Sequence, residues 1–167
     1  AIGVSDGYEP RLAALMKAGV DMILLDSAHG YTSYMIDVLR HIKKTQPTLT
    51  VMAGNIATYA AAEAFVKAGA DSLRVGMGPG AICTTRIVSG MGIPQVTAIM
   101  EVAKATKGSA VSVVADGGIK YSGDMIKALA AGASAVMMGS YFASCEEAPG
   151  ELFQLHANDI PSRFKSI

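Results

Sequence analysis

The sequence contains no tryptophan and only two cysteines among 167 residues, and its charges balance, with 14 Lys plus Arg and 14 Asp plus Glu. Two cysteines without metal-ligand spacing exclude a disulfide scaffold or a zinc site and suit a reducing compartment, which predicts a cytoplasmic protein. Balanced charge offers no basic surface for nucleic acid or for an anionic membrane. No apolar run approaches the roughly 18 residues that span a bilayer, so we expect no nucleic-acid partner and no membrane partner.

What the sequence does have is a high apolar content, 51% of residues, and an internal repeat. Three times, a helical pattern ends in a small-residue turn that leads directly into an apolar strand, at residues 17–26, 67–76 and 131–139. Each turn has a glycine where a helix end needs a left-handed residue. The length fits one domain over residues 1–167, and we expect no second domain.

The repeat predicts about six βα units in a row. The expected strands are continuous apolar runs, which are typical of a parallel sheet covered on both faces. They lie at residues 2–5, 22–26, 49–53, 72–76, 111–115 and 135–139. The expected helices lie near residues 9–18, 33–44, 58–68, 94–106 and 123–131.

Alternating βα units form either an open doubly wound sheet or a TIM (β/α)8 barrel. Here glycine and polar residues follow nearly every expected strand, and barrel enzymes collect their functional residues from many strand ends in this way. If the glycines at 117–118 and 139 belong to phosphate loops after strands 7 and 8, the chain holds strands 3 to 8. A complete barrel needs about 250 residues, so the sequence predicts an α/β fold that is a partial TIM barrel.

The most informative segment is the run from Gly76 to Arg86, in which three glycines alternate and Cys83 follows. Such a loop lets the backbone approach a ligand closely, and a cysteine exposed on it can be reactive. The alternative is a small filler residue at a tight turn. The whole segment closely resembles the active-site cysteine loop of the IMP dehydrogenase / GMP reductase family, and the resemblance extends from Asp26 to Glu151.

This resemblance implies a covalent reaction. Cys83 would attack C2 of the hypoxanthine ring of IMP, hydride would pass to NAD, and hydrolysis would release xanthosine monophosphate. Thr85 matches the threonine that contacts the hydrolytic water. The carbonyl groups of Gly78, Gly80 and Cys83 match those that surround a potassium ion.

The resemblance also implies which residues bind IMP. Asp116 would accept hydrogen bonds from the ribose hydroxyls, and two glycine loops would hold the phosphate. Ala81 stands where the family commonly has a serine that donates to this phosphate, a loss of about 1 kcal/mol. Asp-Gly-Gly alone could equally be a tight turn. The predicted IMP-binding residues are Ala81, Asp116, Gly117, Gly118, Gly139 and Ser140.

By the same resemblance, a group of strand-end residues would bind NAD. Taken singly, each of them could instead be a cap or a surface charge. They are Asp26, Ser27, Asn55, Arg74, Gly76 and Gly78. We expect His29 to be a loop residue near the cofactor, His41 to be a solvated helix residue, and Cys145 to have no role in the chemistry.

Three functions remain open from the sequence. IMP dehydrogenase is favoured by Ile87 and Val88 after the cysteine loop and by Pro149. The alternatives are GMP reductase, which deaminates GMP with NADPH, and a partial barrel that only binds nucleotide. Residues 163–167 resemble the approach to the family's flap, whose arginine activates water and is not in the sequence, so we expect slow hydrolysis by this chain alone. The resemblance further implies a homo-oligomer, a tetramer.

Overall fold

A five-stranded parallel sheet forms the centre of the computed structural model, which describes residues 1–5 and 7–150. Its strands follow one another in chain order, so each strand pairs with the next. A doubly wound sheet would instead reverse its strand order at a switch point. The order therefore confirms the predicted partial-barrel architecture, and the sheet is not closed. The strands are β1 (Met22–Asp26), β2 (Thr50–Ile56), β3 (Ser72–Val75), β4 (Ser112–Asp116) and β5 (Ala135–Met137).

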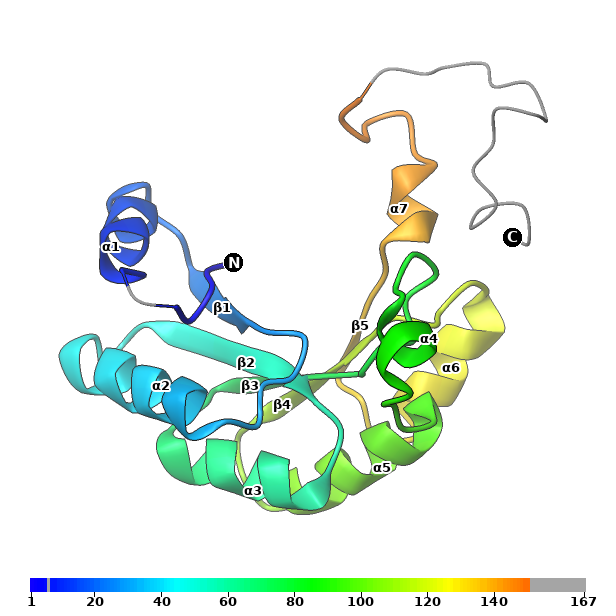
Figure 1. Ribbon diagram of the computed structural model, residues 1–167, viewed down its shortest axis with the longest axis horizontal. Helices are drawn as coiled ribbons and strands as arrows, with labels where there is room; N and C mark the ends of the chain where they lie inside the picture. Colours follow the sequence, from blue (N-terminus) through cyan, green and yellow to red (C-terminus); the bar gives the residue numbers. More distant parts are fainter. Residues whose placement is uncertain (6, 151–167) are drawn as a thin grey trace.

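Helices cover the convex side of this sheet (Figure 1). All five helices that the sequence predicts are present, namely α1 (Glu9–Lys17), α2 (Ser33–Thr45), α3 (Tyr59–Ala68), α5 (Gln95–Thr106) and α6 (Ser122–Ala130). Two short helices were not predicted, α4 (Thr85–Ser89) and α7 (Ser140–Ala143). None of the helices in the described ranges is long and apolar enough to cross a membrane.

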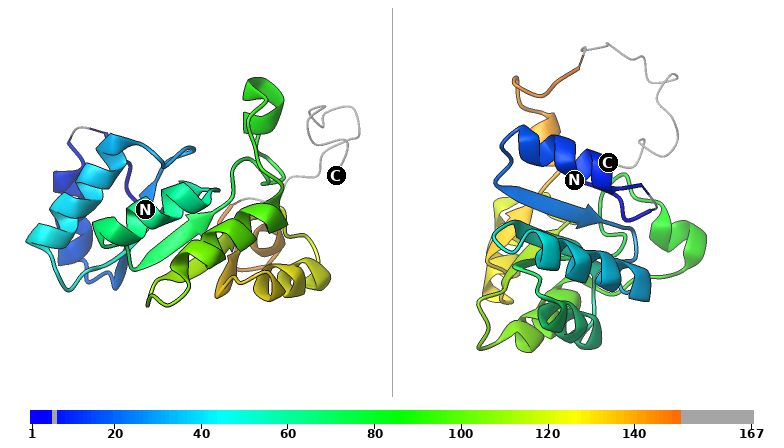
Figure 2. Two further views of the ribbon diagram at one scale, coloured as in Figure 1. Left: turned by 90° about the horizontal axis from the view of Figure 1, so that it is seen from below. Right: turned by 90° about the vertical axis from the view of Figure 1, so that its left-hand side faces the viewer.

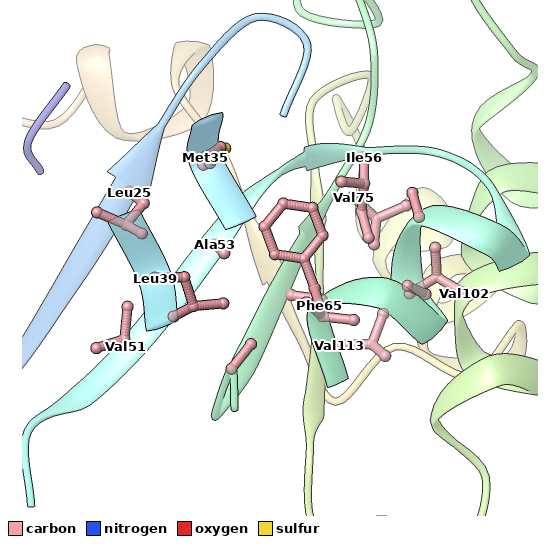
Figure 3. Packing of buried hydrophobic residues seen from close by; sticks show 14 of the residues in the cluster. Leu25, Met35, Leu39, Val51, Ala53, Ile56, Phe65, Val75, Val102 and Val113 are labelled. Carbon is pink, nitrogen blue, oxygen red and sulfur yellow. The ribbon is translucent and has the colours of Figure 1, made fainter. Parts of the chain in front are cut away.

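The core lies between the sheet and helices α2, α3 and α5. Phe65 of α3 is completely buried and stands at its centre, between Leu39 of α2 and Val102 of α5 (Figure 3). Residues of β2 and β3 close the other side, including Val51, Ala53 and Val75. Burying one such side chain contributes about 1.5–3 kcal/mol, so this layer fixes the strand ends that carry the polar residues.

Three of the predicted strands differ from the structure by more than one residue. The strand expected at residues 2–5 is reduced to one bridge between Ile2 and Leu25, because only Ile2 reaches the edge of β1, donating to Leu24 O at 2.8 Å and accepting from Asp26 N at 2.9 Å. The described residues thus form five strands, one fewer than predicted. Strand β2 continues to Ile56, past its predicted end, and β5 already ends at Met137.

Candidate active site

The cysteine loop leaves the sheet directly after β3. It projects as a hairpin that carries α4 and returns to the start of α5 (Figure 2). Cys83 is half-buried on this hairpin, and its sulfur lies 3.2 Å from Thr85 Oγ1. Hydrogen bonds from the Thr85 hydroxyl and amide lower the pKa of the Cys83 thiol, and burial opposes them in part. The charges of Arg86, which lowers the pKa, and of Asp116, which raises it, have smaller effects. More of Cys83 is therefore thiolate, the nucleophilic form, at neutral pH.

A cavity of about 400 Å³ opens beside the cysteine loop. This volume is within the range of about 300–1,000 Å³ typical of small-molecule sites. Its walls come from the cysteine loop, the end of β4 and the segment after β5. All six residues predicted to bind IMP line it: Ala81, Asp116, Gly117, Gly118, Gly139 and Ser140.

Two glycines bring two of these walls into contact. Gly117 and Gly118 have φ values of +85° and +74°. A Cβ atom on Gly117 would lie 3.0 Å from the backbone nitrogen of Gly80, and one on Gly118 would lie 3.3 Å from Cβ of Pro79. The cysteine loop can thus pack directly against the end of β4 only because both positions lack a side chain.

A second, smaller cavity of about 170 Å³ adjoins the first. Gly80, Asp116 and Gly117 line both cavities, so the two spaces share a wall. The smaller cavity is lined by Cys83 and Thr85 and by all six residues predicted to bind NAD: Asp26, Ser27, Asn55, Arg74, Gly76 and Gly78. The structure therefore places the predicted catalytic pair in the same cavity as the residues predicted to bind NAD, next to the cavity of the residues predicted to bind IMP.

Arg74 connects the two acidic residues of this region. Its guanidinium forms an ion pair with Asp26, and its Nε lies 3.7 Å from Asp116 Oδ2. The side chain reaches Asp26 across the intervening strand, where Gly54 is the register partner of both residues. A Cβ atom at position 54 would lie 2.6 Å from Cβ of Arg74, so the glycine provides the space for this crossing.

Asn55 is positioned by a bulge. Strand β2 pairs Gly54 with Arg74 and Ile56 with Val75, which leaves Asn55 as an extra residue. A bulge re-aims a side chain relative to a regular strand. Asn55 Nδ2 donates to Gly76 O at 2.6 Å and to Asp116 Oδ2 at 2.9 Å. Asn55 was predicted to follow the strand; it lies within it, and the irregular register accounts for its direction.

Sequence reasoning missed Gln95. Its Nε2 donates to Val75 O at 2.9 Å and to Asp116 O at 3.0 Å, and so ties the ends of β3 and β4 together. A glutamine in the first turn of a helix gives no signal in the sequence that its partners are distant backbone carbonyls. Lys120 and Met138 also line the larger cavity and were not predicted.

The remaining side chains that drew attention in the sequence lie on the surface. His29, His41 and Cys145 are exposed. His29 follows the smaller cavity's Asp26, Ser27 and Ala28, and its carbonyl accepts from Ser27 Oγ at 3.1 Å. Residues 163–167, whose sequence resembles the approach to a flap, lie outside the described residues.

The fold and the site together define an α/β partial barrel with two adjoining cavities, the smaller of which is lined by a thiol. Residues 1–163 match the protein family described as IMP dehydrogenase / GMP reductase domain. The chain belongs to this family.

Three bacterial enzymes are among its relatives. The chain is 53% identical over 151 residues to "Inosine-5'-monophosphate dehydrogenase" of Aquifex aeolicus (strain VF5), which covers 90% of this chain and 31% of that protein. It is 53% identical to the enzyme of the same name from Pasteurella multocida (strain Pm70), over 91% of this chain and 31% of that protein. It is 52% identical to the enzyme of the same name from Staphylococcus aureus (strain Mu50 / ATCC 700699), over 92% of this chain and 32% of that protein. The chain thus spans about a third of the length of these relatives.

Proposed function

We propose that this chain carries the catalytic site of an IMP dehydrogenase, which oxidises IMP to xanthosine monophosphate. The observation that carries the proposal is the position of Cys83, whose loop forms a wall of both cavities. One cavity can accept the nucleotide while the other accepts the group that takes up the hydride. The names of the relatives support this activity.

The reaction begins at the thiolate of Cys83, whose formation the Thr85 hydroxyl and amide favour. The sulfur forms a bond to C2 of the purine, and the hydrogen on C2 leaves with its electron pair as hydride. NAD, when bound, supplies the acceptor for this hydride. Water then adds to C2 and the C–S bond breaks, which returns the thiolate and yields the 2-oxo product, while one proton of the water goes to the purine ring nitrogen and the other to solvent. Thr85 is close enough to the sulfur to contact that water.

Asp116 and the two glycine loops would hold IMP. A carboxylate accepts hydrogen bonds from a vicinal diol, which suits the ribose. The segments at Gly117–Gly118 and Gly139–Ser140 offer backbone N–H groups and a hydroxyl to the phosphate. Ala81 contributes no hydroxyl, so we expect the other donors to carry phosphate binding.

The smaller cavity is chemically suited to the nicotinamide end of NAD. Asn55 Oδ1 and Arg74 Nε are buried there without a hydrogen-bond partner among the described residues. One is an acceptor and the other a donor, which complements a carboxamide that both donates and accepts. A volume of about 170 Å³ suits one ring rather than a dinucleotide. Asp26, Ser27, Gly76 and Gly78 would complete this part of the site.

A potassium ion would be held by the carbonyl oxygens of Gly78, Gly80 and Cys83. Carbonyl oxygens are suitable ligands for a hard cation. Gly80 O already accepts from Cys83 N at 3.0 Å, whereas the other two carbonyls accept no hydrogen bond within the described ranges. The ion would order the loop around the cysteine.

The assembly we propose is a homo-oligomer, a tetramer, in the cytoplasm. Large apolar side chains on the outer surfaces of α4, α5 and α6 support association, among them Ile87, Val88, Met100 and Ile126, which are 57–84% exposed. Free thiols at Cys83 and Cys145 support a reducing compartment.

The test is to mix the chain with IMP and NAD and to follow both NADH absorbance and the mass of the Cys83 peptide. We expect a burst of NADH of at most one equivalent per chain, together with an adduct on Cys83. Cys83→Ala should abolish both signals, and Cys145→Ala should leave both unchanged.

Two further arms separate the alternatives. Consumption of NADPH with GMP, and no NADH with IMP, would indicate GMP reductase. Binding of IMP in calorimetry without either redox signal would indicate a nucleotide-binding module, and the proposed activity would then be wrong.

A further inference from the structure

Arg86 closes the cysteine hairpin at its base. We define this hairpin as residues 78–92, between the end of β3 and the start of α5. Arg86 Nε donates to Met77 O at 2.9 Å and its Nη2 donates to Ile93 O at 2.6 Å. Met77 and Ile93 are the residues immediately before and after the hairpin, so one guanidinium joins its two ends.

The backbone of the hairpin is shaped around this side chain. A Cβ atom added at Gly78 would lie 2.7 Å from Cγ of Arg86, and one added at Gly92 would lie 2.6 Å from its Nε. Both glycines therefore pack against the arginine, and φ at Gly78 is +75°. The side chain of Arg86 is thus packed between Gly78 and Gly92, and this packing also fixes the position of α4, which carries Arg86.

Among the residues that the structure describes, no carboxylate forms an ion pair with Arg86. The ion pairs found among residues 1–5 and 7–150 involve other cations: Arg40, Lys43, Lys67, Arg74 and Lys127. Arg86 instead bonds to two neutral carbonyls, three residues beyond Cys83 in the chain. The guanidinium is thus committed to the two ends of the hairpin.

We propose that Arg86 is a positioning residue that holds Cys83 at the wall of the smaller cavity by closing the hairpin with its rigid guanidinium. The planar guanidinium bonds two carbonyls that a single ammonium group could not reach together. The inference rests on the proposed function only in taking Cys83 as the nucleophile and IMP as its ligand.

The experiment compares Arg86→Met, which removes both the positive charge and the two hydrogen-bond donors, with Arg86→Lys, which retains the charge but has a single ammonium group. The control is Arg40→Met, which removes an exposed arginine from α2. Alkylation of Cys83 by iodoacetamide at pH 7 is measured by peptide mass spectrometry, without nucleotide and with IMP, and Cys145 in the same chain is the reference. Circular dichroism melting checks that each variant is folded.

For Arg86→Met we expect IMP to protect Cys83 about three- to tenfold less well than in the parent, because the hydrogen bonds that close the hairpin are gone. Arg86→Lys should also lose protection, because one ammonium group cannot join both carbonyls. Arg40→Met should match the parent in both readouts.

The inference is overturned if Arg86→Met leaves IMP protection of Cys83 as in the parent, or if the alkylation of Cys145 and that of Cys83 change together. If Arg86→Met does not fold, Arg86→Lys decides: parental IMP protection in that variant removes the positioning role. Protection of Cys83 by IMP needs binding but no turnover, so it can support the positioning role of Arg86 even if the chain fails to oxidise IMP. The two proposals can therefore fail separately.

Discussion

Asn55 Nδ2 donates a hydrogen bond to Asp116 Oδ2 at 2.9 Å, and thereby links the bulge of β2 to the end of β4. The other proton of the same amide goes to Gly76 O at 2.6 Å. Three neighbouring strand ends are therefore joined by one side chain. Because Asp116 lines both cavities, a substitution at Asn55 should change the affinity for the ligand in each cavity.

Replacing Asn55 by aspartate tests this link. Asn55→Asp places a second carboxylate against Asp116, and two like charges at this distance repel each other. We expect IMP to bind about tenfold or more weakly, since a hydrogen bond to a charged group contributes about 1.5–3 kcal/mol. Calorimetric titration measures the effect. Gln46→Glu, which adds the same charge at the end of α2, should leave affinity unchanged, and equal loss in both variants would contradict the prediction.

The ribose is the expected partner of Asp116. If this carboxylate accepts from the diol, 2′-deoxy-IMP should bind the parent chain about tenfold or more weakly than IMP. In Asp116→Ala the two nucleotides should bind with nearly equal, weakened affinity, because the discriminating group is gone. Competition binding with both nucleotides measures the ratio. An unchanged preference for IMP in Asp116→Ala would assign the recognition of the 2′-hydroxyl to another residue.

Thr85 should control the titration of Cys83. Thr85→Val removes the hydroxyl that lies 3.2 Å from the sulfur and is the largest cause of the lowered pKa. The thiolate then forms only at higher pH, so the alkylation profile of Cys83 should shift in the alkaline direction and its rate at pH 7 should fall. Thr84→Val is the matched control, because the exposed Thr84 side chain makes no capping hydrogen bond. A shift of similar size in Thr84→Val would refute the assignment.

The outline of the fold could be predicted because burial on both faces makes parallel strands read as apolar runs, and because glycines mark helix ends. Gly19, Gly69 and Gly132 all have positive φ as expected. Asp116 could likewise be found as a carboxylate at the end of an apolar strand. Its function, like that of the other site residues, stays a prediction until ligands are tested.

Other features depend on partners that are far away in the sequence. The bulge at Asn55 exists only relative to the register of β3, which no local pattern specifies. Gln95 and Arg86 act through backbone carbonyls, and every residue has a carbonyl, so their partners leave no signature in the sequence. The residue 2–5 segment has strand-like composition, but only Ile2 reaches the edge of β1.

The crossing of Arg74 over Gly54 should make this glycine intolerant of substitution. In Gly54→Ala the new Cβ would lie 2.6 Å from both the Cβ atom and the carbonyl oxygen of Arg74. Either the strand that carries Arg74 or the Arg74 side chain must therefore shift. Overpacking of this kind costs about 1–3 kcal/mol, and we expect the free energy of unfolding to fall by this amount. Urea denaturation measures it. Gly123→Ala, where a Cβ meets nothing within 4 Å, should be neutral or slightly stabilising.

Asp124 should make the stability of the loop before α6 depend on pH. Its Oδ2 accepts from Lys120 N at 3.1 Å and from Tyr121 N at 3.2 Å, and these backbone hydrogen bonds lower its pKa. A carboxylate whose pKa is depressed by folding stabilises the folded state above its unfolded pKa of about 3.9, and this contribution is lost as the pH falls through the folded pKa. Asp124→Asn should therefore lower the melting temperature at pH 7, and the difference from the parent should shrink steadily in acid.

Asp37→Asn provides the comparison for this last prediction. Asp37 is a carboxylate on α2 whose ion pair with Arg40 is exposed, and such pairs contribute little to stability. Its melting temperature should stay near that of the parent from neutral pH into acid. A constant deficit in Asp124→Asn across the same range would mean that the substitution acts through helix packing, and that the charge of Asp124 does not secure the loop beside Lys120.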